Sequence, residues 1–159
     1  MNLKKLSIDE IRIVFDFDGV LTDNNVYVNS SGDEYVRCSR SDGLGFDILK
    51  KYSVDAMVLS SESNKVVSIR CKKLQIPCIQ AIKDKESQIK NIIRENPDKK
   101  ILYVGNDLND LKAMKLCHIK ICPKDSAKEI IALSDITLTS RGGEGVVREI
   151  AVDLLGLDY

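Results

Sequence analysis

The chain has 159 residues, a length typical of a single domain. Its 24 Lys and Arg residues balance 24 Asp and Glu residues, so the formal net charge is zero and gives no reason to expect a nucleic-acid partner. No apolar stretch reaches the roughly 20 residues that cross a membrane, and the start MNLKKLSIDE lacks the apolar core of a secretion signal, so we expect a cytoplasmic protein without a membrane partner.

Short β-rich segments alternate with segments of helical periodicity. The predicted strands are Ile11–Phe15, Ala56–Leu59, Ile101–Val104, Ile119–Cys122 and a weaker Ile136–Leu138. Apolar residues at helical spacing predict helices around residues 44–49, 66–74, 89–93, 111–114, 130–131 and 146–154. This alternation predicts an α/β fold, a Rossmann-like doubly wound parallel sheet with helices on both faces.

A predicted β-hairpin interrupts the alternation between the first strand and the first helix. Its β-rich arms, residues 25–29 and 34–38, flank the turn Ser30-Ser31-Gly32-Asp33. The hairpin is either a surface flap or an assembly or lid element, because an isolated hairpin is marginally stable until it packs on something. We expect one domain over residues 1–159 that carries this insert at about residues 25–38.

Residues that follow the predicted strands are the candidates for chemistry, because ligands of open parallel sheets bind beyond the carboxyl ends of the strands. Asp16 and Asp18 follow the first strand and project to the same side of an extended chain. At about 4 Å, two such charges repel by ~4 kcal/mol at an effective dielectric constant near 20. A cation such as Mg²⁺, or protonation of one carboxyl, would relieve this repulsion. The alternative is a strand end capped by Asp in a turn.

Three later segments add candidates of the same kind. Ser60-Ser61-Glu62-Ser63 offers hydroxyls and backbone N–H groups suited to a phosphate, unless Ser63 is only a helix N-cap. Lys85 follows a possible N-cap, Asp84, and a lysine at a helix start indicates an anionic partner, or else a solvated surface charge. Gly105-Asn106-Asp107-Leu108-Asn109-Asp110 offers oxygen ligands for a metal, or else a polar turn with helix caps.

Cysteine and histidine contribute little to the predicted chemistry. Five cysteines without a C-x-x-C pair argue against a zinc site or a disulfide framework. A single histidine, His118, excludes most histidine-based triads and metal centres. Catalysis must therefore come from carboxylates, hydroxyls, Lys and Arg.

The four segments, in this order, resemble the signature of the haloacid dehalogenase (HAD) superfamily of phosphohydrolases: D-x-D-G-V, a serine, a lysine before a helix, and an acidic G-x-D-x-x-D. The resemblance covers nearly the whole chain. With only a hairpin between motifs and no cap domain, the chain is similar to the capless branch, and in particular to the 3-deoxy-D-manno-octulosonate 8-phosphate phosphatase family. Residues 41–45 and 141–149 match this family as well. Close relatives include nonulosonate (sialic-acid-type) 9-phosphate phosphatases and the carboxy-terminal domains of some sialic-acid cytidylyltransferases.

The resemblance implies a role for each candidate residue. Asp16 would attack phosphorus and form an aspartyl-phosphate, Asp18 would serve as general acid and base, and Ser60 and Lys85 would hold the phosphoryl group. Mg²⁺ is the implied cofactor, with candidate ligands Asp16, Asp18, Asn106, Asp107 and Asp110. The candidate substrate-binding residues are Asp42, Gly43, Ser61, Glu62, Lys73 and Arg141.

Two departures from the family pattern bear on substrate and activity. Glu62 stands where relatives often have an Arg that meets the sugar-acid carboxylate, and Glu62 together with Lys73 is similar to the nonulosonate 9-phosphate phosphatases. Asn106 stands where many relatives have a metal-binding Asp, and its amide brings an oxygen without a charge. Gly-Asn at this point is also similar to the cytidylyltransferase-fused domains, some of which are thought to lack catalysis.

The resemblance therefore predicts a Mg²⁺-dependent phosphatase that acts on a phosphorylated nonulosonate-type sugar acid, in sialic acid or lipopolysaccharide biosynthesis. The alternative substrate is 3-deoxy-D-manno-octulosonate 8-phosphate. A different alternative is a weakly active or non-catalytic tetramerisation module related to the acylneuraminate cytidylyltransferase domains. A third, a response-regulator-like receiver, is disfavoured because a receiver does not need the second Asp of D-x-D. The family also implies a homotetramer with the hairpins at its centre and a neighbour's tail closing each site.

Overall fold

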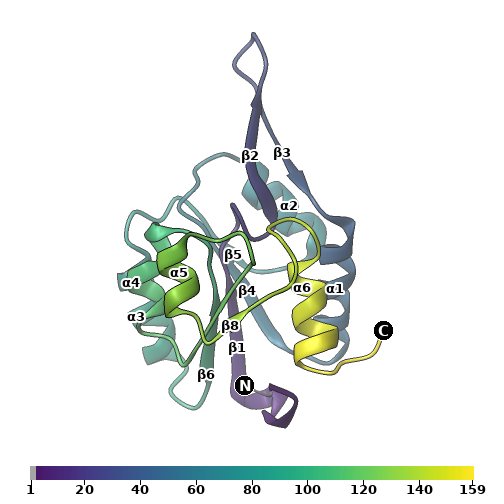
Figure 1. Cartoon of the computed structure of the whole chain (residues 1–159), viewed down its shortest axis with the longest axis vertical. Coiled ribbons are helices and arrows are strands. Elements are labelled where there is room, and N and C mark those ends of the chain that lie inside the picture. The colour runs from purple at the N-terminus through teal and green to yellow at the C-terminus, as the bar shows by residue number, and fades with distance from the viewer. Residues whose placement is uncertain (1–2) are drawn as a thin grey trace.

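The computed structural model describes residues 3–159, which form an α/β fold around one parallel sheet (Figure 1). The sheet has six strands in the order β5-β4-β1-β6-β7-β8, and every neighbouring pair is parallel. The strands are β1 Ile11–Phe15, β4 Asp55–Leu59, β5 Cys78–Ile79, β6 Lys100–Val104, β7 Ile119–Cys122 and β8 Ile136–Thr137. The predicted Rossmann-like doubly wound sheet is confirmed. Between β1 and β6 the strand order reverses, which is where open sheets of this kind bind ligands.

Helices cover both faces of the sheet (Figure 1). On one face lie α1 (Arg40–Lys51), α2 (Val66–Leu74) and α6 (Val146–Glu149), which continues as a π-helical turn over Ile150–Leu154. The opposite face carries α3 (Lys85–Glu95), α4 (Leu111–Met114) and α5 (Lys128–Leu133). Short 3₁₀ turns complete the fold at Leu3–Lys5, Ile8–Glu10 and Leu108–Asp110.

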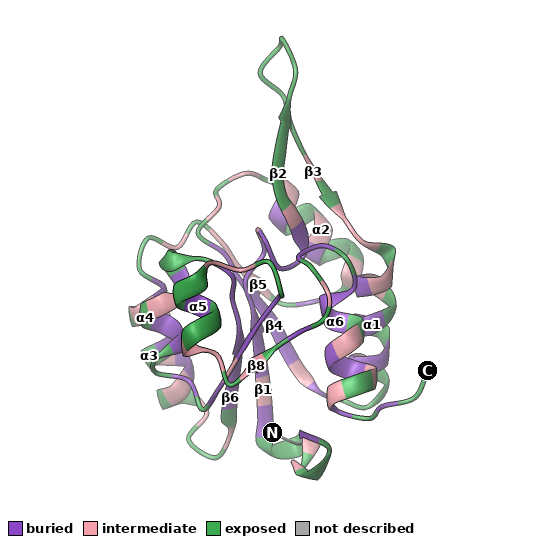
Figure 2. Cartoon of the chain, viewed as in Figure 1, coloured by how far each residue is buried: buried purple, intermediate pink, exposed green. Residues whose placement is uncertain are grey.

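Each central strand is apolar on both sides because it feeds both core layers. Ile13 and Phe15 of β1 pack in the layer under α1 and α6, whereas Val14 packs in the layer under α3 and α4. The rings of Phe15 and Phe46 meet edge to face, with centroids 5.3 Å apart. Figure 2 shows the buried strands between partly exposed helices. This double burial explains the continuous apolar runs from which the strands were predicted.

Most predicted elements are confirmed, with differences at the ends. Asp84 is the N-cap of α3, as predicted, since its side chain accepts a hydrogen bond from the Ser87 N–H. Ser63 is not the N-cap of α2: the helix begins at Val66, and the N–H of Val66 donates to the side chain of Asn64. Strand β5 was missed because two residues are too few to establish a period.

The hairpin consists of β2 (Thr22–Val28) and antiparallel β3 (Glu34–Cys38) and projects away from the sheet (Figure 1). It begins three residues earlier than predicted. The side chain of Asn29 shapes the turn by accepting hydrogen bonds from the Ser31 and Asp33 N–H groups. Four of its large apolar side chains are more than half exposed, namely Val26, Tyr27, Val28 and Tyr35, whereas Val36 packs partly buried against the core.

Two sequence-based exclusions can be checked over the described part of the chain. All five cysteines, which lie within residues 3–159, are free. Among residues 3–159, no helix has the length and apolar character needed to cross a membrane.

Candidate active site

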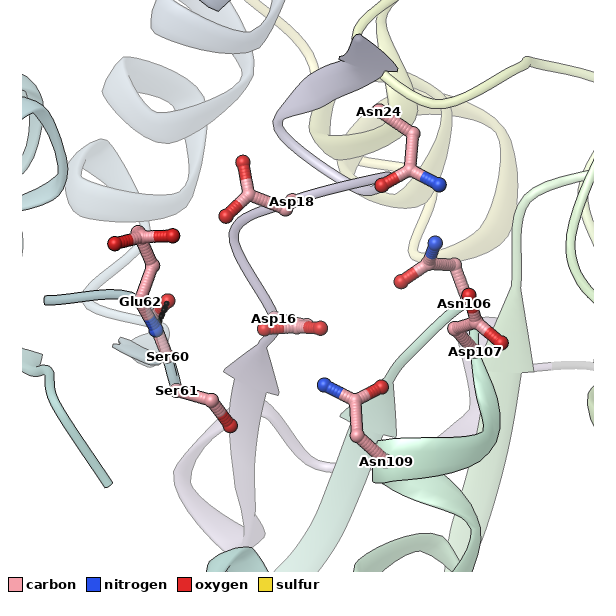
Figure 3. Close-up of a pocket in the computed structure, with 9 residues that line it drawn as sticks. All are labelled: Asp16, Asp18, Asn24, Ser60, Ser61, Glu62, Asn106, Asp107 and Asn109. Atoms are coloured by element: carbon pink, nitrogen blue, oxygen red, sulfur yellow. Dashed lines mark hydrogen bonds between the residues drawn. The ribbon is translucent and has the colours of Figure 1, made fainter. Parts of the chain in front are cut away.

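A cavity of about 400 Å³ opens at the carboxyl ends of β1, β4 and β6 (Figure 3). Asp16 lies at its centre, between a wall of serines and Glu62 on one side and a wall of asparagines and Asp107 on the other. Among residues 3–159, no Lys or Arg side chain lines it. The lining residues are Asp16, Asp18, Asn24, Ser60, Ser61, Glu62, Asn106, Asp107 and Asn109.

The loop after β1 forms a tight turn that aims both aspartates at the cavity. The carbonyl of Phe17 accepts hydrogen bonds from the N–H groups of Leu21 and Thr22. Gly19 has φ +74°, and a Cβ there would lie 1.8 Å from the Asn106 side-chain nitrogen. Glycine is therefore required both by the left-handed backbone and by the close approach of Asn106.

One oxygen of the Asp16 carboxylate is held by hydrogen bonds, and the other is free to bind a ligand. Its Oδ1 accepts hydrogen bonds from the Phe17 N–H and the Lys85 Nζ, each at 2.7 Å. Its Oδ2 has no hydrogen-bond partner among residues 3–159, and the side chain lines the cavity. Burial and the nearby charge of Asp110 raise the pKa of Asp16 to about 8 although Lys85 opposes them. A cation in the cavity would counter this rise and keep Asp16 ionised.

Lys85 is buried beneath the cavity floor and joins two carboxylates. Its Nζ lies 2.7 Å from Oδ1 of Asp16 and 2.7 Å from Oδ1 of Asp110. Burial alone would lower its pKa, but the two carboxylates outweigh burial and raise it, so Lys85 stays charged. The alternative of a solvated surface lysine is wrong, because only 4% of the residue is exposed.

Asp18 occupies the rim of the cavity, above Asp16 (Figure 3). Its Oδ1 accepts a hydrogen bond of 3.2 Å from the hydroxyl of Thr22, a fully buried residue. Burial raises the pKa of Asp18, the Thr22 hydrogen bond lowers it, and the net shift is upward. A carboxyl that holds its proton at higher pH than usual is suited to donate it as a general acid.

The wall after β4 contributes the predicted hydroxyls. Ser60 is almost fully buried, and its Oγ accepts a hydrogen bond from the Glu62 N–H. Ser61 and Glu62 also line the cavity. Glu62 accepts a hydrogen bond from the Asn64 N–H, whereas Lys73, named with it in the sequence analysis, lines a different depression.

The residues after β6 have two different roles: some cap the 3₁₀ turn, and another is suited to bind a metal. Asp107 and Asp110 form a reciprocal capping box at the 3₁₀ turn, so the capping alternative holds for these two residues. Both oxygens of Asp110 are used internally: Oδ1 by Lys85 and the Tyr103 hydroxyl, Oδ2 by the N–H groups of Asn106 and Asp107. Asp110 does not line the cavity, which argues against its predicted role as a metal ligand.

Asn106 is the residue of this wall that is suited to a cation. Its Oδ1 is buried and has no hydrogen-bond partner, an unsatisfied acceptor that costs free energy until something binds it. Within residues 3–159, no three His, Cys, Asp or Glu side chains are placed to hold a metal by themselves. The amide oxygen of Asn106 with Asp16 makes an oxygen donor set of the kind that Mg²⁺ prefers.

Four predicted substrate-binding residues lie outside the cavity. Asp42 is buried between helices, where it accepts a hydrogen bond from the Val147 N–H, and burial raises its pKa to about 6. Gly43 and Lys73 line a separate depression together with Arg40 and Arg70. Arg141 is exposed and lines none of these cavities.

Two residues of the cavity, Asn24 and Asn109, were not singled out as candidates from the sequence. Asn109 belongs to the segment after β6, so its position in that segment could have marked it as a candidate. Asn24 lies at the base of the hairpin with φ +63°, a left-handed conformation that Asn tolerates better than most residues. Nothing in the pattern around Asn24 signals that the hairpin base turns back toward β6.

Curated proteins of known function are similar in sequence to this chain over most of its length. No family model matches the sequence. The chain is 29% identical over 141 residues to N-acylneuraminate cytidylyltransferase A of Danio rerio, which corresponds to 86% of this chain but only 33% of that protein. Over 146 residues it is 27% identical to the 3-deoxy-D-manno-octulosonate 8-phosphate phosphatase KdsC of Escherichia coli K12, covering 90% of this chain and 77% of the relative.

Solved structures place the fold in one family. The chain is 36% identical to a HAD family hydrolase from Streptomyces avermitilis, with a TM-score of 0.89 over 97% of this chain and 91% of the other. It is 30% identical to the 3-deoxy-D-manno-octulosonate 8-phosphate phosphatase of Moraxella catarrhalis, which was solved with magnesium, phosphate and the sugar acid; the TM-score is 0.85 and the coverage 93% and 87%. The chain belongs to the haloacid dehalogenase superfamily and is a phosphatase of the 3-deoxy-D-manno-octulosonate 8-phosphate phosphatase type.

Proposed function

We propose that this chain hydrolyses the phosphate monoester of a sugar acid through an aspartyl-phosphate on Asp16, with Mg²⁺ as cofactor. The observation that carries the proposal is the state of the Asp16 carboxylate. One of its oxygens is fixed by Lys85 and the Phe17 N–H, the other has no hydrogen-bond partner among residues 3–159, and the side chain lines the cavity. A fixed carboxylate with one free oxygen is arranged to attack a phosphorus atom that enters the cavity.

The surrounding residues supply the remaining steps. Asp18 donates its proton to the leaving alkoxide and then removes a proton from the water that hydrolyses the aspartyl-phosphate. Ser60 donates a hydrogen bond to a phosphoryl oxygen. Asp16, the main-chain carbonyl of Asp18 and Asn106 Oδ1 would hold Mg²⁺, which neutralises charge on the transferring phosphoryl group when bound.

For the substrate we propose a nonulosonate 9-phosphate, with 3-deoxy-D-manno-octulosonate 8-phosphate as the alternative. The carboxylate of Glu62 lines the cavity. It can accept hydrogen bonds from the hydroxyls of a sugar, whereas it would repel the carboxylate of a sugar acid. The relative from Danio rerio is an N-acylneuraminate enzyme, which favours the nine-carbon acid. The Moraxella catarrhalis structure contains the eight-carbon acid, which favours the alternative.

We further propose that the active form is a homotetramer in which the hairpins pack together. The exposed side chains of Val26, Tyr27, Val28 and Tyr35 are an apolar surface that association would bury. Lys73 lies in a depression outside the cavity, so we propose that it contacts the substrate bound to a neighbouring copy. Such a contact would supply the cation that the cavity itself lacks for a sugar-acid carboxylate.

Phosphate release tests the proposal. We expect the wild-type chain to release phosphate from a nonulosonate 9-phosphate in the presence of Mg²⁺ and to lose this activity with EDTA. Asp16→Asn should abolish turnover and keep the fold, as judged by circular dichroism. Wild-type rates in that variant would exclude Asp16 as nucleophile. Faster release from 3-deoxy-D-manno-octulosonate 8-phosphate would select the alternative substrate, and a stable tetramer without turnover on either would select the non-catalytic module.

A further inference from the structure

Tyr103 is a fully buried tyrosine on the central strand β6, in a core layer that is otherwise apolar. Its neighbours in this layer include Val14, Ile89 and Met114. A hydroxyl buried among such side chains is unfavourable unless it finds a hydrogen-bond partner. The partner here is Oδ1 of Asp110, at 2.8 Å. This contact satisfies the buried hydroxyl.

Asp110 receives hydrogen bonds from two directions. The N–H groups of Asn106 and Asp107 reach Oδ2 from the loop after β6, whereas Tyr103 reaches Oδ1 from within the sheet. Lys85 shares Oδ1 with Tyr103. The backbone donors hold one end of the carboxylate, and the Tyr103 hydroxyl fixes the other end on the rigid strand. Tyr103 thus determines where the oxygen that receives Lys85 lies.

The position of Lys85 matters because its ammonium spans Asp110 and Asp16 at 2.7 Å from each. A lysine has a flexible four-carbon stem, so its anchoring partner decides where the charge resides. If Asp110 rotates, the ammonium follows it and leaves Asp16. We propose that Tyr103 is a positioning residue for phosphoryl transfer, which acts through Asp110 to hold Lys85 against the attacking carboxylate. This inference rests on the proposed function, in which Asp16 is the nucleophile.

Tyr103→Phe tests the inference because it removes one oxygen and keeps every carbon contact of the ring. We expect kcat to fall about 10-fold, the size of effect typical of residues that orient a catalytic group. The KM for the phosphate ester and the Mg²⁺ concentration for half-maximal rate should stay within twofold, since Tyr103 does not line the cavity. Should the variant be insoluble, Tyr103→Met replaces it, because methionine adapts to irregular core space.

The matched control is Ile101→Val on the same strand and in the same apolar layer. It removes one methylene and no polar atom, so it should lower the melting temperature without lowering kcat. In wild type, the ammonium protons of Lys85 should exchange slowly with solvent by NMR, and this protection should be lost in Tyr103→Phe but kept in Ile101→Val.

Two results would overturn the inference: wild-type kcat in Tyr103→Phe, or an equal loss of kcat in Ile101→Val. A different experiment would show that the proposed function itself is wrong. If Asp16→Asn kept its turnover, Asp16 would not be the nucleophile, whatever the Tyr103 variants do.

Discussion

Replacing Lys85 with methionine tests the central electrostatic feature of the site, a single buried cation between two buried carboxylates. The Nζ lies 2.7 Å from an oxygen of Asp16 and 2.7 Å from an oxygen of Asp110, so these oxygens are at most about 5.4 Å apart. At that separation and an effective dielectric constant near 20, two unit negative charges repel by ~3 kcal/mol. Lys85→Met removes the charge that offsets this repulsion and keeps most of the side-chain volume.

The folded variant has two responses to that repulsion, both measurable. It can hold a proton on one carboxyl, or it can remain ionised and lose stability. The pKa of Asp16, already raised to about 8 by burial and Asp110, should rise further once Lys85 no longer lowers it. The folded variant then binds more protons than folded wild type, so its deficit in unfolding free energy grows with pH, by ~1.4 kcal/mol per pH unit for each extra proton.

Urea unfolding at pH 6 and pH 9 without Mg²⁺ measures this deficit. We expect a deficit that is larger at pH 9, together with at least a 100-fold lower turnover at either pH, the scale on which removal of one electrostatic contact to the transition state acts. Lys90→Met is the control on the same helix: Lys90 is exposed and pairs with Glu86, so turnover and the pH dependence should not change. Equal deficits for Lys85→Met at the two pH values would refute the reasoning.

Two further predictions concern the cation. Asn106→Asp should lower the Mg²⁺ concentration needed for half-maximal phosphate release, since a carboxylate replaces the neutral, unpartnered Oδ1; an unchanged requirement would show that another residue ligates. Mg²⁺ should raise the melting temperature of the wild-type chain more at pH 9 than at pH 6, because burial and Asp110 raise the pKa of Asp16 to about 8 and the metal must displace its proton below that pH. A stabilisation independent of pH would contradict a metal site on Asp16.

Short-range rules were enough to predict from the sequence that Asp16 and Asp18 lie at one edge of the sheet, where both line the cavity. Asp16 and Asp18 follow an unbroken apolar strand, and a strand buried on both faces ends at the ligand-binding edge of the sheet. For Lys85, at a helix start directly after its N-cap Asp84, the sequence left open an anionic partner or a solvated surface charge, and the structure shows the anionic partners Asp16 and Asp110. In each case, the signal lies within a few residues of the side chain that carries the chemistry.

Residues whose roles depend on distant contacts could not be predicted in this way. The family resemblance makes Asp42 a candidate substrate ligand, but its carboxylate accepts a hydrogen bond from the Val147 N–H, 105 residues away in the sequence. It also makes Asp110 a candidate metal ligand, but Asp110 pairs with Lys85, 25 residues away. Both are buried acidic residues within motifs that also contain ligand candidates. Only the packing of helices and loops decides which acidic side chain faces the cavity and which one lies behind it.

The neutral Asn106 bears on whether the site can turn over. When Asp18 holds the proton of a general acid, Asp16 and Asp110 carry two negative charges, and Lys85 offsets one of them. A bound divalent cation brings the sum for these groups to one positive charge, which attracts an anionic phosphate ester. An aspartate at position 106 would bind the cation more tightly but cancel that positive charge. An oxygen ligand without charge therefore binds the metal more weakly but keeps the attraction for the phosphate, and Asn106 by itself is no argument against catalysis.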